Sequence, residues 1–391
     1  MKLFSQNDFL AASGRRAGGL LAAALMLAGL AGATPALAAK PVITQVTTGT
    51  FNSCALDNSG HVWCWGRNDR GQLGDGTTTQ RLTPVKVHAL SGVTQIATGG
   101  EHSCALLTSK RVKCWGPNSS GQLGDDSTTD RLTPVKVHRL KNVAQIAAGN
   151  THSCAVLSSG RAKCWGFNFY GQLGDGTITT RLTPVRVHQL QNVAHIAAGT
   201  VHSCARLTNG RAKCWGNNSG GRLGDGTTIN RLTPVFVHRL KSVSQLSAGG
   251  SHSCAALGSG QAKCWGNNQR GQLGDGTIIN RTTPVSVHQL QNVTQVAAGN
   301  VHSCAVLSSG RAKCWGFNFN GEIGDGSTTQ RLMPVRVHQL QNASGIAASE
   351  AHSCTVLTNG RVKCWGWNAN GQLGDGTTTD RHLPVLVQFP G

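Results

Sequence analysis

The sequence is short of acidic residues, aromatic residues and helix-like patterns, and each shortage excludes a class of protein. Asp and Glu number 16 against 36 Lys and Arg, and only 5% of the residues are aromatic, with a single tyrosine. So few carboxylates argue against calcium-binding loops, which cluster several acidic oxygens. Almost no hydrophobic pattern follows the helical period, which excludes a helical bundle. Together with 51 glycines, these shortages favour a turn-rich all-β protein.

The cysteines are spaced with complete regularity. A stretch that runs from His152 to Gly166 recurs seven times at offsets of 50 residues, and each copy holds two cysteines ten positions apart. In the copy around Gly210, a three-residue loop ends on this glycine, which is the usual three-residue connection of a β-hairpin. Counting outward from the loop places Cys204 opposite Cys214 at a non-hydrogen-bonded pair, where the Cα atoms approach to about 4.5 Å, within disulfide range. The predicted disulfides are Cys54–Cys64, Cys104–Cys114, Cys154–Cys164, Cys204–Cys214, Cys254–Cys264, Cys304–Cys314 and Cys354–Cys364.

Disulfides need an oxidising compartment, and the N-terminal segment has the layout of an export signal. Arg15 and Arg16 precede an apolar run from Leu20 to Ala33, and Ala36-Leu37-Ala38 resembles a cleavage site. We therefore expect residues 1–38 to be a signal peptide and the mature protein to be soluble and secreted or periplasmic. The run of about 14 residues is short for a membrane anchor, which needs about 20. The paired arginines leave a twin-arginine signal open, although their context favours general secretion.

Each 50-residue unit is predicted to contain about four short strands. In the third unit, residues 143–148 alternate as a strand, the two hairpin arms follow, and residues 184–188 close the unit with proline at a strand start. A four-stranded sheet repeated at this period is typical of a propeller blade, because one blade must stack on its neighbours to bury its faces. The sequence therefore predicts a single domain, residues 39–391, that is an all-β, seven-bladed β-propeller built from seven repeats.

Three recurring strings resemble the regulator-of-chromosome-condensation repeat over about residues 42–389. They are Ala-Ala-Gly-x-x-His-Ser-Cys-Ala-x-Leu, Gly-Arg-x-Lys-Cys-Trp-Gly-x-Asn and Gly-Gln-Leu-Gly-Asp-Gly. The resemblance implies a seven-bladed propeller in which repeat and blade are offset, so that Val42–Gly49 would pair within the blade that holds Pro384–Val387. Nuclear members of this family act on a small GTPase and on chromatin. The cysteine pairs and the export signal depart from those members, and no insertion breaks the 50-residue period.

Repeated histidines, serines and aspartates could suggest chemistry. One histidine set is His102, His152, His202, His252, His302 and His352, and a second is His88, His138, His188, His238, His288 and His338. A ring of six is too wide for one metal ion, so we expect these side chains to hold turns. The residue types of a catalytic triad are present in Ser153, His152 and Asp175. The serine recurs seven times, however, and an enzyme rarely carries so many equivalent nucleophiles. We instead expect Asp175 to pair with Arg181, and we expect no catalytic residue, metal or cofactor, hence no enzyme.

The loop after each Trp-Gly is where the seven copies differ most. Copies three, six and seven carry aromatic residues there, and aromatic residues and arginine are the types that anchor protein interfaces. A second variable string, residues 77–80 and its equivalents, includes Ile178, Ile229, Ile278 and Ile279 and is a weaker candidate. The residues that we expect to contact a partner are Phe167, Phe169, Tyr170, Phe317, Phe319 and Trp367, flanked by Arg70 and Arg270.

These observations predict a rigid binding platform or inhibitor that engages a protein partner through one face. The alternatives are guanine nucleotide exchange on a small GTPase and binding of cell-wall polysaccharide. The formal charge of +20, which becomes +18 without residues 1–38, allows an anionic envelope polymer as a partner. Nucleic acid is disfavoured for an exported protein. We expect a monomer with no membrane span once the signal peptide is removed.

Overall fold

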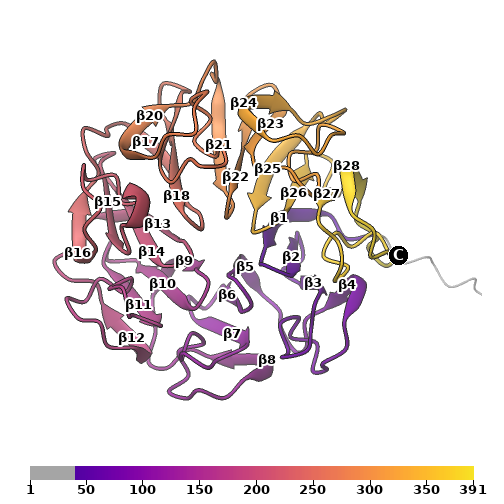
Figure 1. The fold of residues 1–391 in the computed structure, drawn as a ribbon. Coiled ribbons are helices and arrows are strands. Elements are labelled where there is room, and N and C mark those ends of the chain that lie inside the picture. Colours follow the sequence, from indigo (N-terminus) through magenta and orange to yellow (C-terminus); the bar gives the residue numbers. More distant parts are fainter. Residues whose placement is uncertain (1–39) are drawn as a thin grey trace, which may run out of the picture. The chain divides into compact units, whose positions relative to one another are not determined.

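A computed structural model describes residues 40–391, which form seven four-stranded antiparallel sheets around a central axis (Figure 1). In the first blade, β1 (Ile43–Thr48) is innermost and is followed outward by β2 (Asn52–Asp57), β3 (Val62–Gly66) and β4 (Arg81–Lys86). The one helix in this part of the chain is the short η1 (Ser219–Gly221). The seven-bladed, four-stranded propeller is therefore confirmed, whereas the predicted signal peptide lies outside the described residues.

The other six blades repeat this order. Their strands are β5 (Val93–Thr98), β6 (Ser103–Leu107), β7 (Val112–Gly116), β8 (Arg131–Lys136), β9 (Val143–Ala148), β10 (His152–Leu157), β11 (Ala162–Gly166), β12 (Arg181–Arg186), β13 (Val193–Ala198), β14 (His202–Leu207), β15 (Ala212–Gly216), β16 (Arg231–Phe236), β17 (Val243–Ala248), β18 (His252–Leu257), β19 (Ala262–Gly266), β20 (Arg281–Ser286), β21 (Val293–Ala298), β22 (His302–Leu307), β23 (Ala312–Gly316), β24 (Arg331–Arg336), β25 (Ala343–Ala348), β26 (His352–Leu357), β27 (Val362–Gly366) and β28 (Arg381–Leu386). Within residues 40–391, no helix is long and apolar enough to cross a membrane.

The hairpin register and the disulfides follow the sequence prediction. Cys204 lies opposite Cys214, and Ala205 lies opposite Lys213. All seven pairs are bonded within their own hairpin, each with Cα atoms 4.1 Å apart, and no cysteine is free. Each blade therefore has a covalent link between its two central strands.

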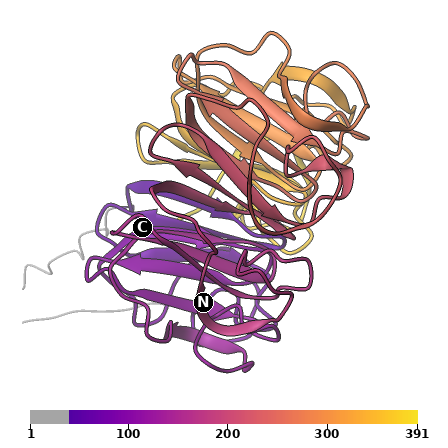
Figure 2. The same cartoon turned by 90° about the vertical axis from the view of Figure 1, so that its left-hand side faces the viewer.

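The antiparallel order gives the propeller two different faces, which Figure 2 shows from the side. One face carries the turns from the first to the second strand of each blade and the long connections from the third to the fourth, such as residues 67–80. We call it the long-loop face. The opposite face carries the hairpin turns, such as residues 58–61, and the links between blades, such as residues 87–92. We call it the hairpin face.

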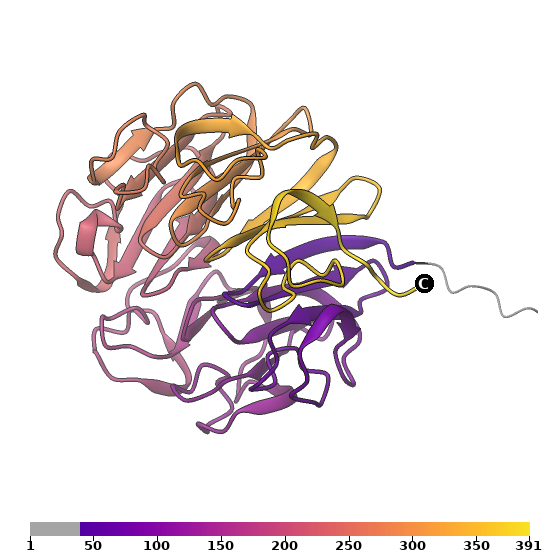
Figure 3. The same cartoon turned by 45° about the vertical axis from the view of Figure 1, so that its right-hand side comes forward.

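The expected offset between repeat and blade is wrong for this chain. β1 pairs with β2 in the first blade, while β25 to β28 complete the last blade without help from the N-terminal strand. A partner three residues further along the chain costs far less loop-closure entropy than one more than 300 residues away. The first and last blades lie side by side (Figure 3), and their boundary is closed by packing and by hydrogen bonds such as Ile43 N to Gly360 O at 3.0 Å.

A buried tryptophan crosses every boundary between blades. Trp115 donates from Nε1 to the carbonyl oxygen of Gln72 in the preceding blade at 3.1 Å, and Trp65 bonds Gln372 in the last blade at 2.8 Å. The equivalent tryptophans make the same bond at the other five boundaries. Gly74 packs against the Trp115 ring at φ +66°, and a Cβ there would lie 2.6 Å from Trp115 Cδ1, so only glycine fits.

A glutamine on the inner strand adds a second link at five boundaries. Gln45 donates to Ile96 O at 2.8 Å and accepts from Ile96 N at 3.0 Å, so one amide satisfies two backbone groups of the next blade. Gln95, Gln145, Gln245 and Gln295 do the same. His195 and Gly345 replace this glutamine in blades 4 and 7, so the boundary between the last and first blades lacks the amide link.

Gly345→Gln is expected to stabilise the domain by restoring that link. A Cβ at Gly345 would meet only Gln295 Oε1, at 3.7 Å, so the site has room. Two new hydrogen bonds to Val46 should contribute roughly 1–2 kcal/mol, and loss of glycine flexibility in the unfolded chain about 0.5–1 kcal/mol more. Urea unfolding under non-reducing conditions measures the gain. Gly345→Ala is the control, since it supplies only the second contribution; equal gains from both variants would contradict the proposed link.

Candidate functional site

The long loops are rigid because buried polar side chains hold them from within. Asn68 donates to Thr77 O at 3.0 Å and accepts from Leu73 N at 2.9 Å. Asp75 binds the Arg81 guanidinium at 2.9 Å, and all seven equivalent Asp–Arg pairs form, as the sequence predicted. Burial alone would raise the pKa of Asp75, but hydrogen bonds from Thr77 and Arg81 outweigh it and hold the pKa below its usual value. The variable side chains therefore stand on a fixed frame.

In blade 3 the predicted contact residues form one aromatic cluster. The rings of Phe167 and Phe169 stack with centroids 6.4 Å apart, and Tyr170 meets Phe169 edge-on at 5.2 Å. Phe167 and Tyr170 are half-buried, whereas Phe169 is 62% exposed. Phe169 is thus the outermost member of the cluster and does not fold under its own loop.

A second cluster crosses the boundary between blades 5 and 6. Phe317 and Phe319 stack with the same 6.4 Å centroid distance as their blade-3 counterparts, and Phe319 is 73% exposed. The Arg270 guanidinium lies 5.5 Å from the centroid of the Phe317 ring, within cation–π range. Arg270 makes no salt bridge within residues 40–391, so its charge is open to a partner.

A third cluster crosses the boundary between blades 7 and 1 and includes a residue that the sequence reasoning missed. Trp367 meets Phe51 edge-on at 5.5 Å, and the Arg67 guanidinium lies 5.1 Å from the Phe51 centroid. Position 51 varies strongly among the blades, and no other blade has an aromatic residue there, which is the signal that could have identified it. Arg70, by contrast, is held by Asp130 in two hydrogen bonds of 2.8 and 3.0 Å. The structure therefore gathers the predicted aromatic residues and Arg270 into three separate clusters on one face. Arg70 belongs to none of them, because it is paired with Asp130.

Arg222 is a further residue that the sequence reasoning passed over. It takes the place of the glutamine found at position 172 in the sequence Gly-Gln-Leu-Gly-Asp-Gly, and this departure is visible in the sequence. Its guanidinium donates to Ser219 O at 3.0 Å and to Gly250 O at 2.9 Å, with no salt bridge in the described part of the chain. Burial lowers the pKa of Arg222, and the nearby Tyr170 opposes that effect. A cation beside the blade-3 aromatic cluster is suited to an acidic group on a partner.

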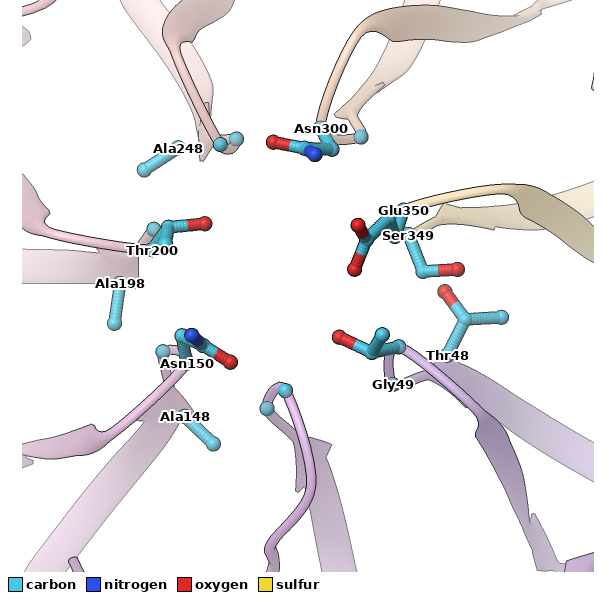
Figure 4. Close-up of a pocket in the computed structure, with 18 of the residues that line it drawn as sticks. Thr48, Gly49, Ala148, Asn150, Ala198, Thr200, Ala248, Asn300, Ser349 and Glu350 are labelled. Atoms are coloured by element: carbon cyan, nitrogen blue, oxygen red, sulfur yellow. The ribbon is translucent and has the colours of Figure 1, made fainter. Parts of the chain in front are cut away.

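The inner turns of the long-loop face surround a cavity of about 260 Å³ on the central axis. Glycine, alanine and small polar residues line it, and Figure 4 shows Asn150, Thr200, Asn300 and Glu350 directed toward the open centre. Glu350 is the one charged residue in this lining. The cavity therefore offers hydrogen-bonding groups but little apolar surface.

The serine–histidine pairs exist, but they are structural. His102 Nε2 lies 2.7 Å from Ser153 Oγ in the next blade, and Ser153 Oγ donates to Gln122 O at 2.9 Å. The imidazole must therefore donate to the serine, so it cannot act as its general base. Both side chains are buried, and the same arrangement closes five other boundaries. These histidines were predicted to hold turns, and they instead link neighbouring blades. Residues 40–391 contain no cluster of three potential metal ligands.

Comparisons with known proteins agree with this fold. The family model for the RCC1-like domain matches residues 170–391, and two models for the regulator of chromosome condensation (RCC1) repeat match segments between residues 43 and 172. The E3 ubiquitin-protein ligase HERC2 of Homo sapiens is 44% identical over 50 residues, which are 13% of this chain and 1% of that protein. The match thus covers a small part of this chain and a very small part of HERC2.

Two solved structures cover most of the chain. Yeast RCC1 (Prp20), in its crystal structure with Kap60, has a TM-score of 0.76 at 24% identity and covers 88% of each chain. Prp20p from Saccharomyces cerevisiae, whose structure was described with its binding properties to Gsp1p and histones, has a TM-score of 0.75 at 25% identity over 85% of this chain and 87% of that one.

His302→Asn is expected to flatten the loss of stability in acid. Burial lowers the pKa of His302 to about 4 from an ordinary 6.5. Between pH 6.5 and about 4, only the unfolded chain binds a proton at this histidine. The stability that neutral His302 contributes to the fold is therefore complete above pH 6.5 and is lost as the pH falls through about 4. The variant should lower the slope of unfolding free energy against pH in this window by up to about 1.4 kcal/mol per pH unit. Urea unfolding across pH 4–7 measures it.

Asn52 already occupies the equivalent position in blade 1, where it is buried with both polar side-chain atoms unpaired, so the variant should fold with a lower overall stability as well as a flatter slope. The exposed His338 on the hairpin face provides the control, and His338→Asn should leave the unfolding curves nearly unchanged. A variant at position 302 that kept the full acid slope would show that the buried ring of histidines does not set it.

Proposed function

The chain belongs to the RCC1-like domain family, and on that premise we propose that it is a rigid platform that binds a protein partner through its long-loop face. The observation that carries this proposal is the exposure of Phe169 and Phe319, at 62% and 73%, on loops that are pinned from within. Exposed aromatic side chains on a rigid frame lose little conformational entropy on binding, and such residues dominate interface energies.

The same aromatic pair is presented twice. Residues 152–169 are identical in sequence to residues 302–319, and both pairs stack with the same 6.4 Å spacing and 21° interplanar angle. The two pairs stand three blades apart on one face. A partner that engages both must span the ring, which fits the area of more than about 1,000 Å² that stable interfaces bury. A repeated or symmetric partner would meet two matching contacts.

Further exposed apolar side chains support the same face. Ile178, Ile229, Ile278 and Ile279 are each more than half exposed, and all stand on the long connections of blades 3, 4 and 5. Arg222 and Arg270 add positive charge beside the aromatic clusters. The partner that fits best therefore combines an apolar surface with acidic groups.

We place this activity outside the cytoplasm. Seven disulfides form and persist in oxidising compartments, and each short loop contributes about 2–3 kcal/mol on a chain-entropy model. The proposed export signal in residues 1–38 is consistent with a secreted or periplasmic protein. The platform has no chemistry of its own in this proposal, because its serine–histidine pairs are buried and the serines donate to backbone carbonyls.

Phe169→Ser combined with Phe319→Ser is expected to abolish partner binding while leaving the fold intact. Ser119 and Ser219 occupy the equivalent positions in blades 2 and 4, so serine suits the loop, and removal of an exposed side chain should change stability by less than about 0.5 kcal/mol. The experiment compares proteins crosslinked to the wild-type and variant domains in medium and envelope fractions, with quantification of each captured species.

Phe236→Ser is the matched control, since Phe236 is also exposed but lies at the hairpin-face end of β16. It should retain the captured proteins. Unchanged capture by the double variant would overturn the proposed face, and accelerated GDP release from a small GTPase would favour nucleotide exchange instead. Retention on cell-wall resin that the double variant loses would favour polysaccharide binding.

A further inference from the structure

The hairpin face carries almost only positive charge, a difference between the two faces that the net charge does not reveal. We count the residues equivalent to 107–113 (hairpin turn) and 136–141 (blade link) in all seven blades. These segments contain 20 Lys and Arg and one acidic residue, Asp57. Asp57 is itself buried and accepts hydrogen bonds from Trp63 and two backbone amides. Every other Asp and Glu side chain in residues 40–391 belongs to the long-loop face, so the two faces differ in chemistry.

The cations are concentrated on three adjacent blades. Blades 2, 3 and 4 contribute thirteen of the 20, from residues 107–113, 136–141, 157–163, 186–191, 207–213 and 236–241, which hold no acidic residue. Blades 1, 5, 6 and 7 supply the other seven at the equivalent positions. We call the six segments the cationic arc. An arc of charge across three blades matches an elongated anion better than a compact one.

None of these cations is neutralised within the described chain. The salt bridges of residues 40–391 all involve other side chains, and the turn residues Lys110, Arg111, Arg161 and Arg211 are exposed. Backbone bonds fix their positions, since Val143 N bonds Lys110 O at 3.1 Å and Val193 N bonds Gly160 O at 2.9 Å. The fold thus holds these positive charges close together, and a bound polyanion would offset their mutual repulsion.

The arc lacks the features that nucleic acid and membrane binding require. Its one exposed large apolar side chain is Phe236, and the Arg211 guanidinium and the Lys213 ammonium lie 3.7 and 4.6 Å from its ring centroid. A single aromatic ring that already contacts two cations offers little for base stacking, whereas single-strand binders stack successive bases on several aromatic side chains. A planar bilayer would contact all seven blades and would not select three. Exposed apolar side chains that could insert into lipid lie mainly on the other face.

We propose that the cationic arc of blades 2–4 is a second binding site, which takes a linear anionic polymer through its repeated charged groups alone. The site is independent of the long-loop face, so the domain can hold a polymer on one side and a protein on the other. Arginine forks suit phosphate, sulfate and carboxylate groups alike, and the length of the arc favours several such groups in series.

The test measures binding of long-chain inorganic polyphosphate to the purified mature domain at several salt concentrations. Binding is expected at physiological ionic strength, with a logarithm of the association constant that falls linearly with the logarithm of salt. Arg111→Gln combined with Arg161→Gln should reduce that slope by about 2, one for each lost contact. Gln261 occupies the same position in blade 5 and keeps the turn bond, Leu257 N to Gln261 O at 2.9 Å, so the variant should fold.

Arg311→Gln combined with Arg361→Gln is the matched control, because it removes the same charges from two adjacent blades outside the arc. It should change the slope much less. Equal effects from both pairs, or no polyphosphate binding, would overturn the arc. Tighter binding of a thymidine oligonucleotide, or of phosphatidylglycerol–phosphatidylcholine vesicles, would also overturn it. Phe169→Ser combined with Phe319→Ser should bind polyphosphate normally, so each proposal can fail without the other.

Discussion

The ring depends on the hydrogen bond from each buried tryptophan to a backbone carbonyl of the preceding blade. A single sheet of four short strands cannot cover its own faces, and the tryptophan fills the space between two sheets while its indole N–H donates to a backbone carbonyl. Trp65 makes this bond across the first and last blades just as Trp115 makes it between the first two. The circle therefore closes by repetition of one contact, with the disulfides stiffening each blade and the inner glutamines tying five of the boundaries.

This closure explains how function and structure are divided within each repeat. The positions that hold the long loops, such as Asn68 and Asp75, and the tryptophans that bridge the blades are nearly constant along the chain, because each makes the same contact in every repeat. Residues that point away from those contacts are free to vary, and they produce aromatic clusters on the long-loop face and uncompensated cations on the hairpin face. A single chain can thus carry two unlike surfaces without any conflict with its core.

Much of the fold could be predicted from the sequence because the determining interactions are local. The loop that ends at Gly210 sets the hairpin register, and the register sets the disulfide between Cys204 and Cys214. The phase of the ring could not be predicted in this way, since it depends on whether β1 pairs locally or with the last blade. Contacts between blades were also hidden: Phe51 meets Trp367, and Arg222 reaches Gly250, only because closure brings distant residues together.

Each blade is continuous in the chain, since β1 to β4 and β25 to β28 form complete sheets at either end. A 50-residue unit can therefore be copied or exchanged by one recombination event without splitting a sheet or a disulfide. Residues 152–169 and 302–319, identical over their whole length, have the form of such an exchange. New binding surfaces could then spread from blade to blade as intact cassettes, and the history of the domain would be recorded in the degree of likeness among its own repeats.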